Sequence, residues 1–463
     1  MPRIWRVRGL KMFRRSVTPL LIGTLLLRTS SGAATVVMGL FLAQLAHVSG
    51  VLITSLQVGL LSVAFFATEL SLAPCMGALG DRWGRRYFLI IAPFLGLLQV
   101  GLVPFTPTAH PLFYLSSLQI LAGTSSAMMT PATLGYLADY TAHNSALRMR
   151  TMSFFELVTS GGIALGVVVG GFAWERFGRA AFGLLAGLYL LVIVCMIVTP
   201  KARQIIERAN LRVMARRYLR MLRTPRLFLF IPAWVSLCAL VGIWFSSQLP
   251  FILSNPVKGY RHQELMGSMA GPGGAHTLSL VLGAYVLFFG LCLVFWAFFM
   301  GRVPRLILML TSILGVYLCC VALFGINHRG ADNNAWLFVW LPLLAVGIFA
   351  ESSFAPAALA YLADISEDAA KDRGLLMGLY SIFLGLGQLI GNGLGGAFAR
   401  SWGFDGLIYL TALLGVIALV ALLVLYKKDR GAFDRQSQPG DLEVRNDGPA
   451  RDSTLLRSSG RAR

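Results

Sequence analysis

Hydrophobic residues run along this chain in long stretches separated by short polar or charged links. Residues 17–45 form one such stretch, broken only by Arg28, and residues 407–426 form another with no charged residue. A helix needs about 20 apolar residues to cross a bilayer. The pattern therefore predicts an all-α integral membrane protein. Twelve helices are expected, over residues 18–47, 51–76, 87–106, 111–138, 152–174, 180–199, 227–254, 277–300, 304–326, 336–362, 374–400 and 404–426.

Composition excludes a soluble fold. Hydrophobic residues make up 56% of the 463 residues, charged residues only 13%, and the mean hydropathy is +0.71. A water-soluble protein of this length could not bury so much apolar surface. The six cysteines lie inside apolar runs without metal-ligand spacing, so we interpret them as core residues and expect no metal or cofactor. The first apolar run is too long for a signal peptide and is interpreted as a retained helix.

The net charge of +20 arises from residues in the links and tails. This distribution indicates membrane topology and gives no reason to expect a nucleic-acid partner. With the N-terminus in the cytoplasm, 33 of the 40 Lys and Arg residues fall on the cytoplasmic side and six on the opposite side. We therefore expect a multi-pass protein of the plasma membrane with both termini in the cytoplasm.

An internal repeat divides the chain into two halves. A shift of 225 residues aligns Pro131–Gly178 with Pro356–Gly403, and 14 of the 48 positions are identical. The shared positions include a Tyr-Leu-Ala-Asp block, at Tyr136–Asp139 and again at Tyr361–Asp364. Two six-helix halves related in this way are a recurring transporter architecture.

The repeat and the polar links define five segments. We expect the long basic link to lie on the membrane surface as an amphipathic helix, the C-terminal tail to be disordered, and the glycine-rich loop 255–276 to be external. The segments are 1–17 (cytoplasmic N-terminal segment), 18–200 (first half), 201–226 (cytoplasmic basic link), 227–426 (second half) and 427–463 (cytoplasmic tail).

One link carries a ten-residue motif, Gly77-Ala-Leu-Gly-Asp81-Arg82-Trp-Gly84-Arg85-Arg86. It resembles the loop motif between helices 2 and 3 of the Major Facilitator Superfamily (MFS), which implies a fold of two pseudo-symmetric six-helix halves. Gly84 would allow a tight turn. Asp81 would bind the positive N-terminal end of the helix that starts near residue 374 and so act as a latch. The alternative is a loop that only sets topology. The second-half counterpart, Gly301-Arg-Val-Pro-Arg305, lacks the aspartate.

A second motif consists of glycines spaced by four. Gly162, Gly166, Gly170 and Gly171 resemble the glycine motif of exporters in the same superfamily, although Val167 stands where that pattern has proline. The resemblance favours export over uptake. Close helix packing explains the spacing equally well. The repeat places the same glycines in the second half, at Gly387, Gly391, Gly395 and Gly396.

Four charged residues fall inside the predicted helices: Arg28, Glu69, Glu156 and Glu351. All except Glu156 lie near mid-depth, where an unpaired charge costs at least a few kcal/mol. One hypothesis is that Glu351 or Glu69 takes up a coupling proton while Arg28 holds a carboxylate or an anionic substrate group. By the resemblance, Arg28 and Glu351 would face a central cavity from opposite halves, and an Arg28–Glu69 pair is conceivable. The alternative is that all of these charges are structural.

Together these features predict a secondary transporter that works by alternating access. The favoured version is proton-coupled export of a small organic molecule by a monomer in the lipid bilayer. Uptake of a metabolite is the alternative, and a non-transporting sensor or lipid-handling protein on the same fold is a third. The chain has no Gly-x4-Gly-Lys-Ser/Thr phosphate loop, so neither ATP-driven transport nor an enzyme is expected.

Overall fold

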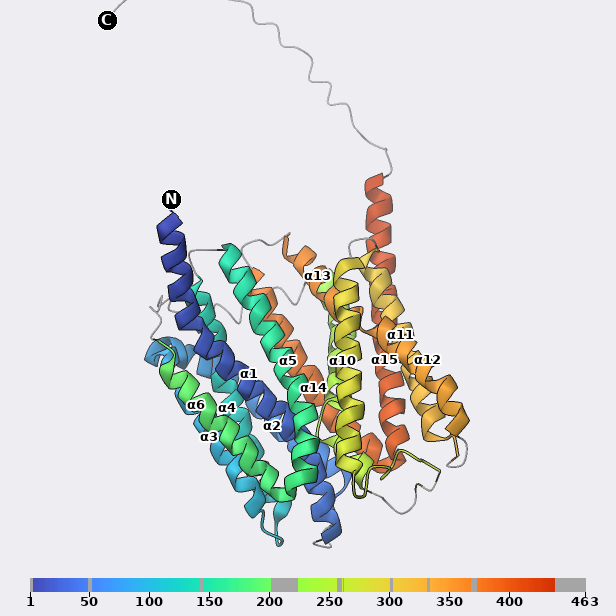
Figure 1. Ribbon diagram of the computed structural model, residues 1–463. Coiled ribbons are helices and arrows are strands. Elements are labelled where there is room, and N and C mark those ends of the chain that lie inside the picture. The colour runs from blue at the N-terminus through green and yellow to red at the C-terminus, as the bar shows by residue number, and fades with distance from the viewer. Residues whose placement is uncertain are drawn as a thin grey trace, which may run out of the picture.

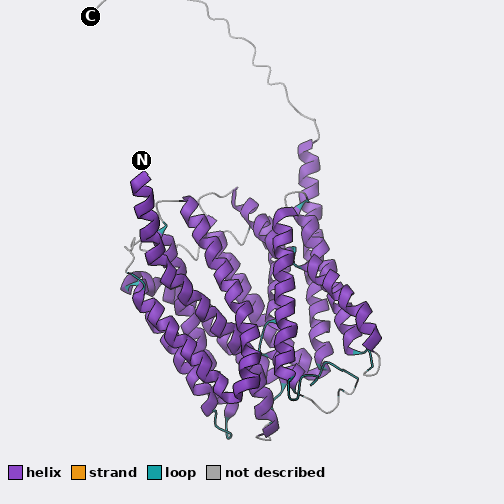
Figure 2. Ribbon diagram, in the orientation of Figure 1, coloured by secondary structure: helices purple, strands orange, loops and turns teal. Residues whose placement is uncertain are grey.

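The computed structural model describes residues 3–48, 52–141, 145–200, 224–255, 260, 262–299, 303–330, 334–367 and 373–437. Every regular element in these ranges is a helix, as Figure 1 and Figure 2 show. The predicted all-α architecture is therefore confirmed.

The first half is built from six long helices. They are α1 (Arg3–Val48), α2 (Ser55–Trp83), α3 (Arg85–Leu102), α4 (Pro111–Tyr140), α5 (Ser145–Phe177) and α6 (Ala181–Val198). Two short 3-10 turns, Val103–Phe105 and Gly178–Ala180, continue α3 and join α5 to α6.

The second half has the same plan, but two of its predicted spans are interrupted. Its helices are α8 (Pro225–Trp244), α9 (Gln248–Ser254), α10 (Gly274–Phe299), α11 (Arg305–Asn327), α12 (Leu337–Glu351), α13 (Phe354–Glu367), α14 (Arg373–Trp402) and α15 (Phe404–Ser437). A 3-10 turn, Asn334–Trp336, precedes α12. The predicted span 227–254 is divided into α8 and α9, and the predicted span 336–362 breaks at Ser352 and Ser353 between α12 and α13.

Ten stretches of the described helices are long and apolar enough to cross a membrane, and one of them, Phe154–Val198, covers both α5 and α6. The 30-residue α4 is not among the ten because its serines and threonines lower its mean hydropathy. With α4 included, and with α8 and α9 and also α12 and α13 each taken as one broken span, the described helices make the twelve spans expected from the sequence.

The helices at the two ends of the chain are longer than the hydrophobic pattern suggested. Helix α1 already begins at Arg3, and α15 continues to Ser437. Residues 201–223 of the basic link and residues 438–463 of the tail lie outside the described residues. In Figure 1 the start of α1 and the end of α15 lie at the same end of the bundle. We call this the terminal end, and the opposite one the distal end.

The two halves touch through α2 with α14, α5 with α10, and α1 with α9. The closest contacts are made by glycines in the distal part of the bundle. A Cβ built on Gly59 of α2 would lie 2.5 Å from the carbonyl oxygen of Asn392 on α14. Gly171 of α5 lies against Ser279 of α10, whose hydroxyl donates to the Val167 carbonyl at 3.3 Å. Small residues thus bring the backbones of opposite halves together at the distal end.

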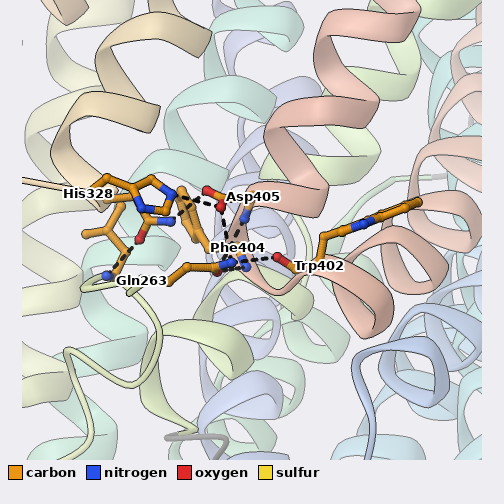
Figure 3. Close-up of polar contacts among 7 residues, drawn as sticks. Gln263, His328, Trp402, Phe404 and Asp405 are labelled. Atoms are coloured by element: carbon orange, nitrogen blue, oxygen red, sulfur yellow. Dashed lines mark hydrogen bonds and ion pairs between the residues drawn. The ribbon is translucent and has the colours of Figure 1, made fainter. Parts of the chain in front are cut away.

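A polar cluster fixes the distal end of the second half (Figure 3). Asp405, only 6% exposed at the start of α15, accepts hydrogen bonds from Asn327 Nδ2 at 2.8 Å and Gln263 Nε2 at 3.1 Å. His328 Nε2 lies 2.8 Å from the same carboxylate. Gln263 Oε1 in turn accepts from the backbone nitrogen of Phe404 at 2.8 Å. These contacts join the segment before α10 to the C-terminal end of α11 and to the N-terminal end of α15.

Candidate functional site

The loop motif folds as a tight turn between α2 and α3. Gly84 has φ of +108°, a backbone conformation that residues with a Cβ rarely adopt. Its N–H donates to the Gly80 carbonyl at 3.0 Å, which ends α2 and allows α3 to start at Arg85. The structure describes the backbone of Asp81 in the last turns of α2 but not its side chain, so the proposed latch to α14 lies outside the described residues.

Two arginines of the motif hold the turn onto the first half. The Arg85 guanidinium forms an ion pair with Asp139 on α4, with 2.5 Å between Nη1 and Oδ2. It crosses over Gly135, where a side chain would collide with it. Arg86 Nη2 donates to the Ile197 carbonyl at the end of α6, at 2.9 Å. The motif therefore joins α3 to α4 and α6, while Arg82 is exposed.

The second half repeats part of this arrangement. Arg305, at the start of α11, donates from Nη1 to the Ala360 carbonyl on α13 at 3.0 Å. Ala360 is the repeat equivalent of Gly135. In each half an arginine after the loop therefore lies at the same repeat position, on α4 in the first half and on α13 in the second. The repeat seen in the sequence thus corresponds to a repeated contact.

The mid-depth charges of the first half gather around α1. Arg28, half-buried on α1, lies within electrostatic range of Glu69 on α2, Glu156 on α5 and Tyr189 on α6. Its Nε is buried and has no hydrogen-bond partner among the residues that the structure describes. Such a donor is costly in a low-dielectric interior unless a ligand or water satisfies it.

The direct pair between Arg28 and Glu69 that the sequence allowed does not form. Glu69 Oε1 instead accepts a hydrogen bond from the hydroxyl of Ser126 on α4, at 2.6 Å. Glu156 is exposed on α5. The structure therefore brings one cation and two carboxylates into the same region, without an ion pair between Arg28 and Glu69.

Glu351 lies apart from this group. It is the last residue of α12, half-buried, with Tyr285 of α10 and Cys319 and Cys320 of α11 as its electrostatic neighbours. A Cβ built on Gly315 would lie 2.5 Å from the Glu351 backbone nitrogen, so α11 and α12 are in close contact here. No cation of the described residues pairs with this carboxylate, and Arg28 is not among its neighbours.

The glycines of α5 and α14 lie at matching helix contacts. Gly162, Gly166 and Gly170 meet the backbone of α1 between Leu25 and Ala33. Gly387 and Gly391 meet α8 at Cys238 and Ala239, and Gly395 faces Gln248. The last glycine of each series reaches the opposite half, Gly171 against α10 and Gly396 against α2. The first three glycines of each series thus pack helices within one half, and the last glycine contacts the other half.

Sequence reasoning missed Asp139 and Ser126. Asp139 could have been found, because it ends the repeated Tyr-Leu-Ala-Asp block and a repeated acidic residue near an arginine-rich loop suggests a pair. Ser126 carried no such signal, since α4 contains many hydroxyl side chains. Among the described residues no group of three or more His, Cys, Asp or Glu could hold a metal ion. The six cysteines, all within the described ranges, are free.

Comparison with known proteins agrees with this architecture. Multidrug resistance protein 1 of Bacillus subtilis is 28% identical over 153 residues, which are 33% of this chain and 37% of that protein. Quinolone resistance protein NorA of Staphylococcus aureus (strain N315) is 29% identical over 147 residues, 32% of this chain and 36% of that protein. The chain thus aligns with little more than a third of the length of these relatives.

Solved structures match over a greater length. The nucleoside transporter NupG has a TM-score of 0.69 at 12% identity and covers 89% of this chain and 98% of its own. A D-xylose-proton symporter has a TM-score of 0.62 at 15% identity, covering 90% and 97%. At such identities the likeness shows the fold. The family model of the Major Facilitator Superfamily matches residues 20–275 and 273–456. With two repeated halves, a loop motif held by Arg85 and this match along nearly its whole length, the chain belongs to the Major Facilitator Superfamily.

Proposed function

We propose that this protein is a secondary transporter that exports a small organic molecule in exchange for protons by alternating access. The observation that carries the proposal is the distribution of contacts between the halves. The described close contacts, from Gly59 with Asn392 to Gly171 with Ser279, lie toward the distal end. Two halves joined at one end around charges at mid-depth are suited to exposing a central site to one side at a time.

The orientation follows from the positive-inside rule. With both termini and the basic link 201–226 in the cytoplasm, the distal end is external. The described contacts would then close the external end, and a substrate would enter from the cytoplasm. Impermeant labelling of single cysteines tests this topology. Labelling from outside within 201–226 would contradict it.

The charges around Arg28 support proton coupling. A carrier needs a carboxyl group that exchanges its proton within the membrane, and Glu69 and Glu351 are the candidates. The buried Nε of Arg28 has no partner in the described part of the chain, so Arg28 can bind a substrate carboxylate or stabilise Glu69 once Glu69 has lost its proton. Export is favoured over uptake because the resistance proteins named above are relatives of this chain by sequence.

The proposal is tested by measuring transport by the purified protein in proteoliposomes with an imposed pH gradient. A fluoroquinolone and a lipophilic cationic dye serve as first substrates, with a nucleoside and a pentose as the uptake alternative. We expect a gradient-driven flux that Glu69→Gln and Glu351→Gln reduce or make independent of pH. Glu69→Asp and Glu351→Asp, which retain the carboxyl group, serve as matched controls and should keep the pH dependence.

Arg28→Ala separates the two roles of the arginine. Loss of flux for an anionic substrate alone would indicate substrate binding, whereas loss for all substrates would indicate an effect on the proton step. If every Gln variant and Arg28→Ala keep the parent rate and pH profile, the charges are structural. Absence of flux for the whole panel, with folded protein, would favour a non-transporting protein on this fold.

A further inference from the structure

A cavity of about 610 Å³ lies in the second half, away from the charges around Arg28. It is bounded by α11, α15, α12 and the 3-10 turn before α12. Most of its lining is apolar or aromatic, and His328 and Arg329 lie at one end. Its other walls include Tyr317, Val321, Phe324, Trp336, Trp340 and Ala412. The volume is in the range of small-ligand sites.

The cavity belongs to a face that contacts the bilayer. Val321 and Phe324 in its lining are 53% and 41% exposed. Leu314, also on α11, and Leu413, on α15, are 60% and 49% exposed. In a membrane protein such large apolar side chains are covered by lipid chains. The medium around the cavity is therefore hydrocarbon along most of its length.

The dimensions match one leaflet. Along α11 the lining runs from Tyr317 to the end of the helix at Asn327, about 15 Å at a rise of roughly 1.5 Å per residue, and His328 and Arg329 follow the helix. A hydrocarbon core of about 30 Å gives each leaflet roughly 15 Å. Trp336 and Trp340 stack with centroids 6.3 Å apart near the distal end, where aromatic residues are expected at the membrane–water interface. The cavity thus runs from the interface toward the bilayer midplane.

The interfacial end of the cavity is polar. Arg329 Nε donates to Glu264 Oε2 at 2.8 Å, while its two terminal amino groups have no hydrogen bond to the described residues. A guanidinium with free donors is well matched to a phosphate. Glu264 pairs with Arg329, and Asp405 lies beside His328 (Figure 3), so this end has two carboxylates beside one arginine and one histidine and no excess of positive charge. The balance favours a zwitterionic headgroup over an anionic one.

The walls of the cavity are held in place by contacts between helices. Tyr317 donates its hydroxyl to the Ala412 carbonyl at 3.2 Å, and Cys320 Sγ lies 3.9 Å from the Ile408 carbonyl oxygen. Both contacts join α11 to α15. Gly325 leaves room for the Trp340 ring, with which a side chain at that position would collide. A preformed cavity loses little entropy when it binds a chain.

We propose that this cavity binds one acyl chain of a zwitterionic glycerophospholipid from the distal leaflet, with the lipid phosphate at Arg329. The bound lipid would lie between α11, α12 and α15 and stabilise their arrangement. This site is separate from the charges around Arg28, and the proposal does not depend on the direction or substrate of transport.

The test measures lipid binding to the whole purified protein. After delipidation in detergent, native mass spectrometry quantifies binding of phosphatidylethanolamine, phosphatidylcholine and phosphatidylglycerol. We expect both zwitterionic lipids to bind more tightly than phosphatidylglycerol and to raise the Tm. A phosphatidylcholine with a photoreactive acyl chain should crosslink to residues 317–329 and 408–412.

Two variants and their controls decide the outcome. Val321→Trp fills the cavity and should abolish the tight binding, whereas Leu314→Trp, on the same lipid-facing helix but outside the cavity, should not. Arg329→Gln should weaken zwitterionic lipid binding about tenfold, the loss expected for one charge-assisted hydrogen bond. Arg400→Gln removes an exposed arginine elsewhere on the distal end and should have no effect.

Three results would overturn the proposal. The first is unchanged binding and crosslinking in Val321→Trp, which would show that the lipid binds elsewhere. The second is equal affinity for all three lipids, which would show that the cavity merely accepts apolar chains. The third is competitive displacement of the lipid by a transported dye or fluoroquinolone, which would make the cavity a substrate site. If Arg329→Gln does not fold, Val321→Trp still decides.

Discussion

The carboxylate of Glu175, at the end of α5, accepts a hydrogen bond of 2.7 Å from the backbone nitrogen of Gly273, immediately before α10. The two residues belong to opposite halves. One turn away, the rings of Phe172 and His276 meet edge to face at 4.4 Å. A carboxylate at the N-terminal end of a helix is stabilised by the backbone N–H groups and the helix dipole. Glu175 therefore helps to hold the halves together at the distal end.

Replacing Glu175 should weaken this closure. An acidic residue at a helix N-terminus contributes about 0.3–1 kcal/mol, so Glu175→Ala should shift the equilibrium roughly two- to fivefold toward a state that is open at the distal end. Disulfide formation between cysteines introduced by Phe172→Cys and His276→Cys, in a background without the native cysteines, reports the closed state. The crosslinking rate follows the population of the closed state, so we expect it to fall by at most this factor.

Glu175→Gln retains an acceptor oxygen without the charge and should have an intermediate effect. Arg176→Ala, an exposed neighbour, is the matched control and should leave the rate unchanged. Equal crosslinking in Glu175→Ala and the parent protein would mean that closure depends on the helix contacts alone.

The glycine contacts between α2 and α14 should also control closure. A Cβ at Gly59 would lie 2.5 Å from the Asn392 carbonyl oxygen and 3.1 Å from the Gly396 Cα. Gly59→Ala should therefore hold the halves apart at the distal end and reduce transport at least tenfold, as a rough estimate, with little loss of Tm because each half remains packed internally. Flux in proteoliposomes and thermal unfolding measure the two effects.

Gly183→Ala provides the control. No atom lies within 4 Å of a Cβ built there, and alanine favours a helix over glycine by up to about 1 kcal/mol. Transport should be normal and the Tm equal or slightly higher. A normal flux in Gly59→Ala would show that the α2–α14 contact does not limit the transport cycle.

The sequence predicted the framework of this fold because bilayer thickness and charge asymmetry leave simple patterns in a chain. Gly84 is an example, since its place in the loop motif indicated a turn and its φ is positive. The break between α8 and α9 was not predicted, because residues 245–247 are Phe-Ser-Ser and Pro250, in the first turn of α9, is a weak signal in a chain where Pro232 lies inside the unbroken α8. There Ser247 and Pro250 pack against Gly39 of α1, so the break accompanies a contact between the halves.

The side-chain contacts of the mid-depth charges were also not predictable from the sequence. Hydrophobic spacing gave the approximate depth of Arg28 and Glu69 but not the side chains around them. The hydroxyl of Ser126, 57 residues away in the sequence, contacts Glu69 because α2 packs on α4. Which of several serines on a helix faces a carboxylate depends on the rotation of that helix about its axis. Apolar and hydroxyl residues are spread around all sides of α4, so its sequence does not define this rotation.

The Arg85–Asp139 ion pair should stabilise the first half. Both side chains are largely buried, so Asp139→Asn or Arg85→Gln should each cost about 1.5–3 kcal/mol. The double variant should cost less than the sum, because each single change already removes the pair. Thermal unfolding in detergent measures the four proteins. Arg82→Gln, at an exposed position of the same loop, is the control, and strict additivity would contradict a direct interaction.

The last prediction concerns Asp405, which orders the distal end of the second half (Figure 3). Its carboxylate accepts from Asn327 and Gln263 and lies 2.8 Å from His328, in the first turn of α15. Asp405→Ala would remove the acceptor of Asn327 Nδ2 and one of the two acceptors of Gln263 Nε2, which still donates to the Trp402 carbonyl at 2.7 Å. It would also remove a favourable charge from a helix N-terminus, and the total cost should be about 3 kcal/mol. We expect a lower Tm and faster proteolysis of residues 262–273, which the cluster holds in place. Asp405→Asn keeps one acceptor oxygen and should lose about half as much. Unchanged proteolysis in Asp405→Ala would mean that this segment is held by its other contacts, such as that of Glu264 with Arg329.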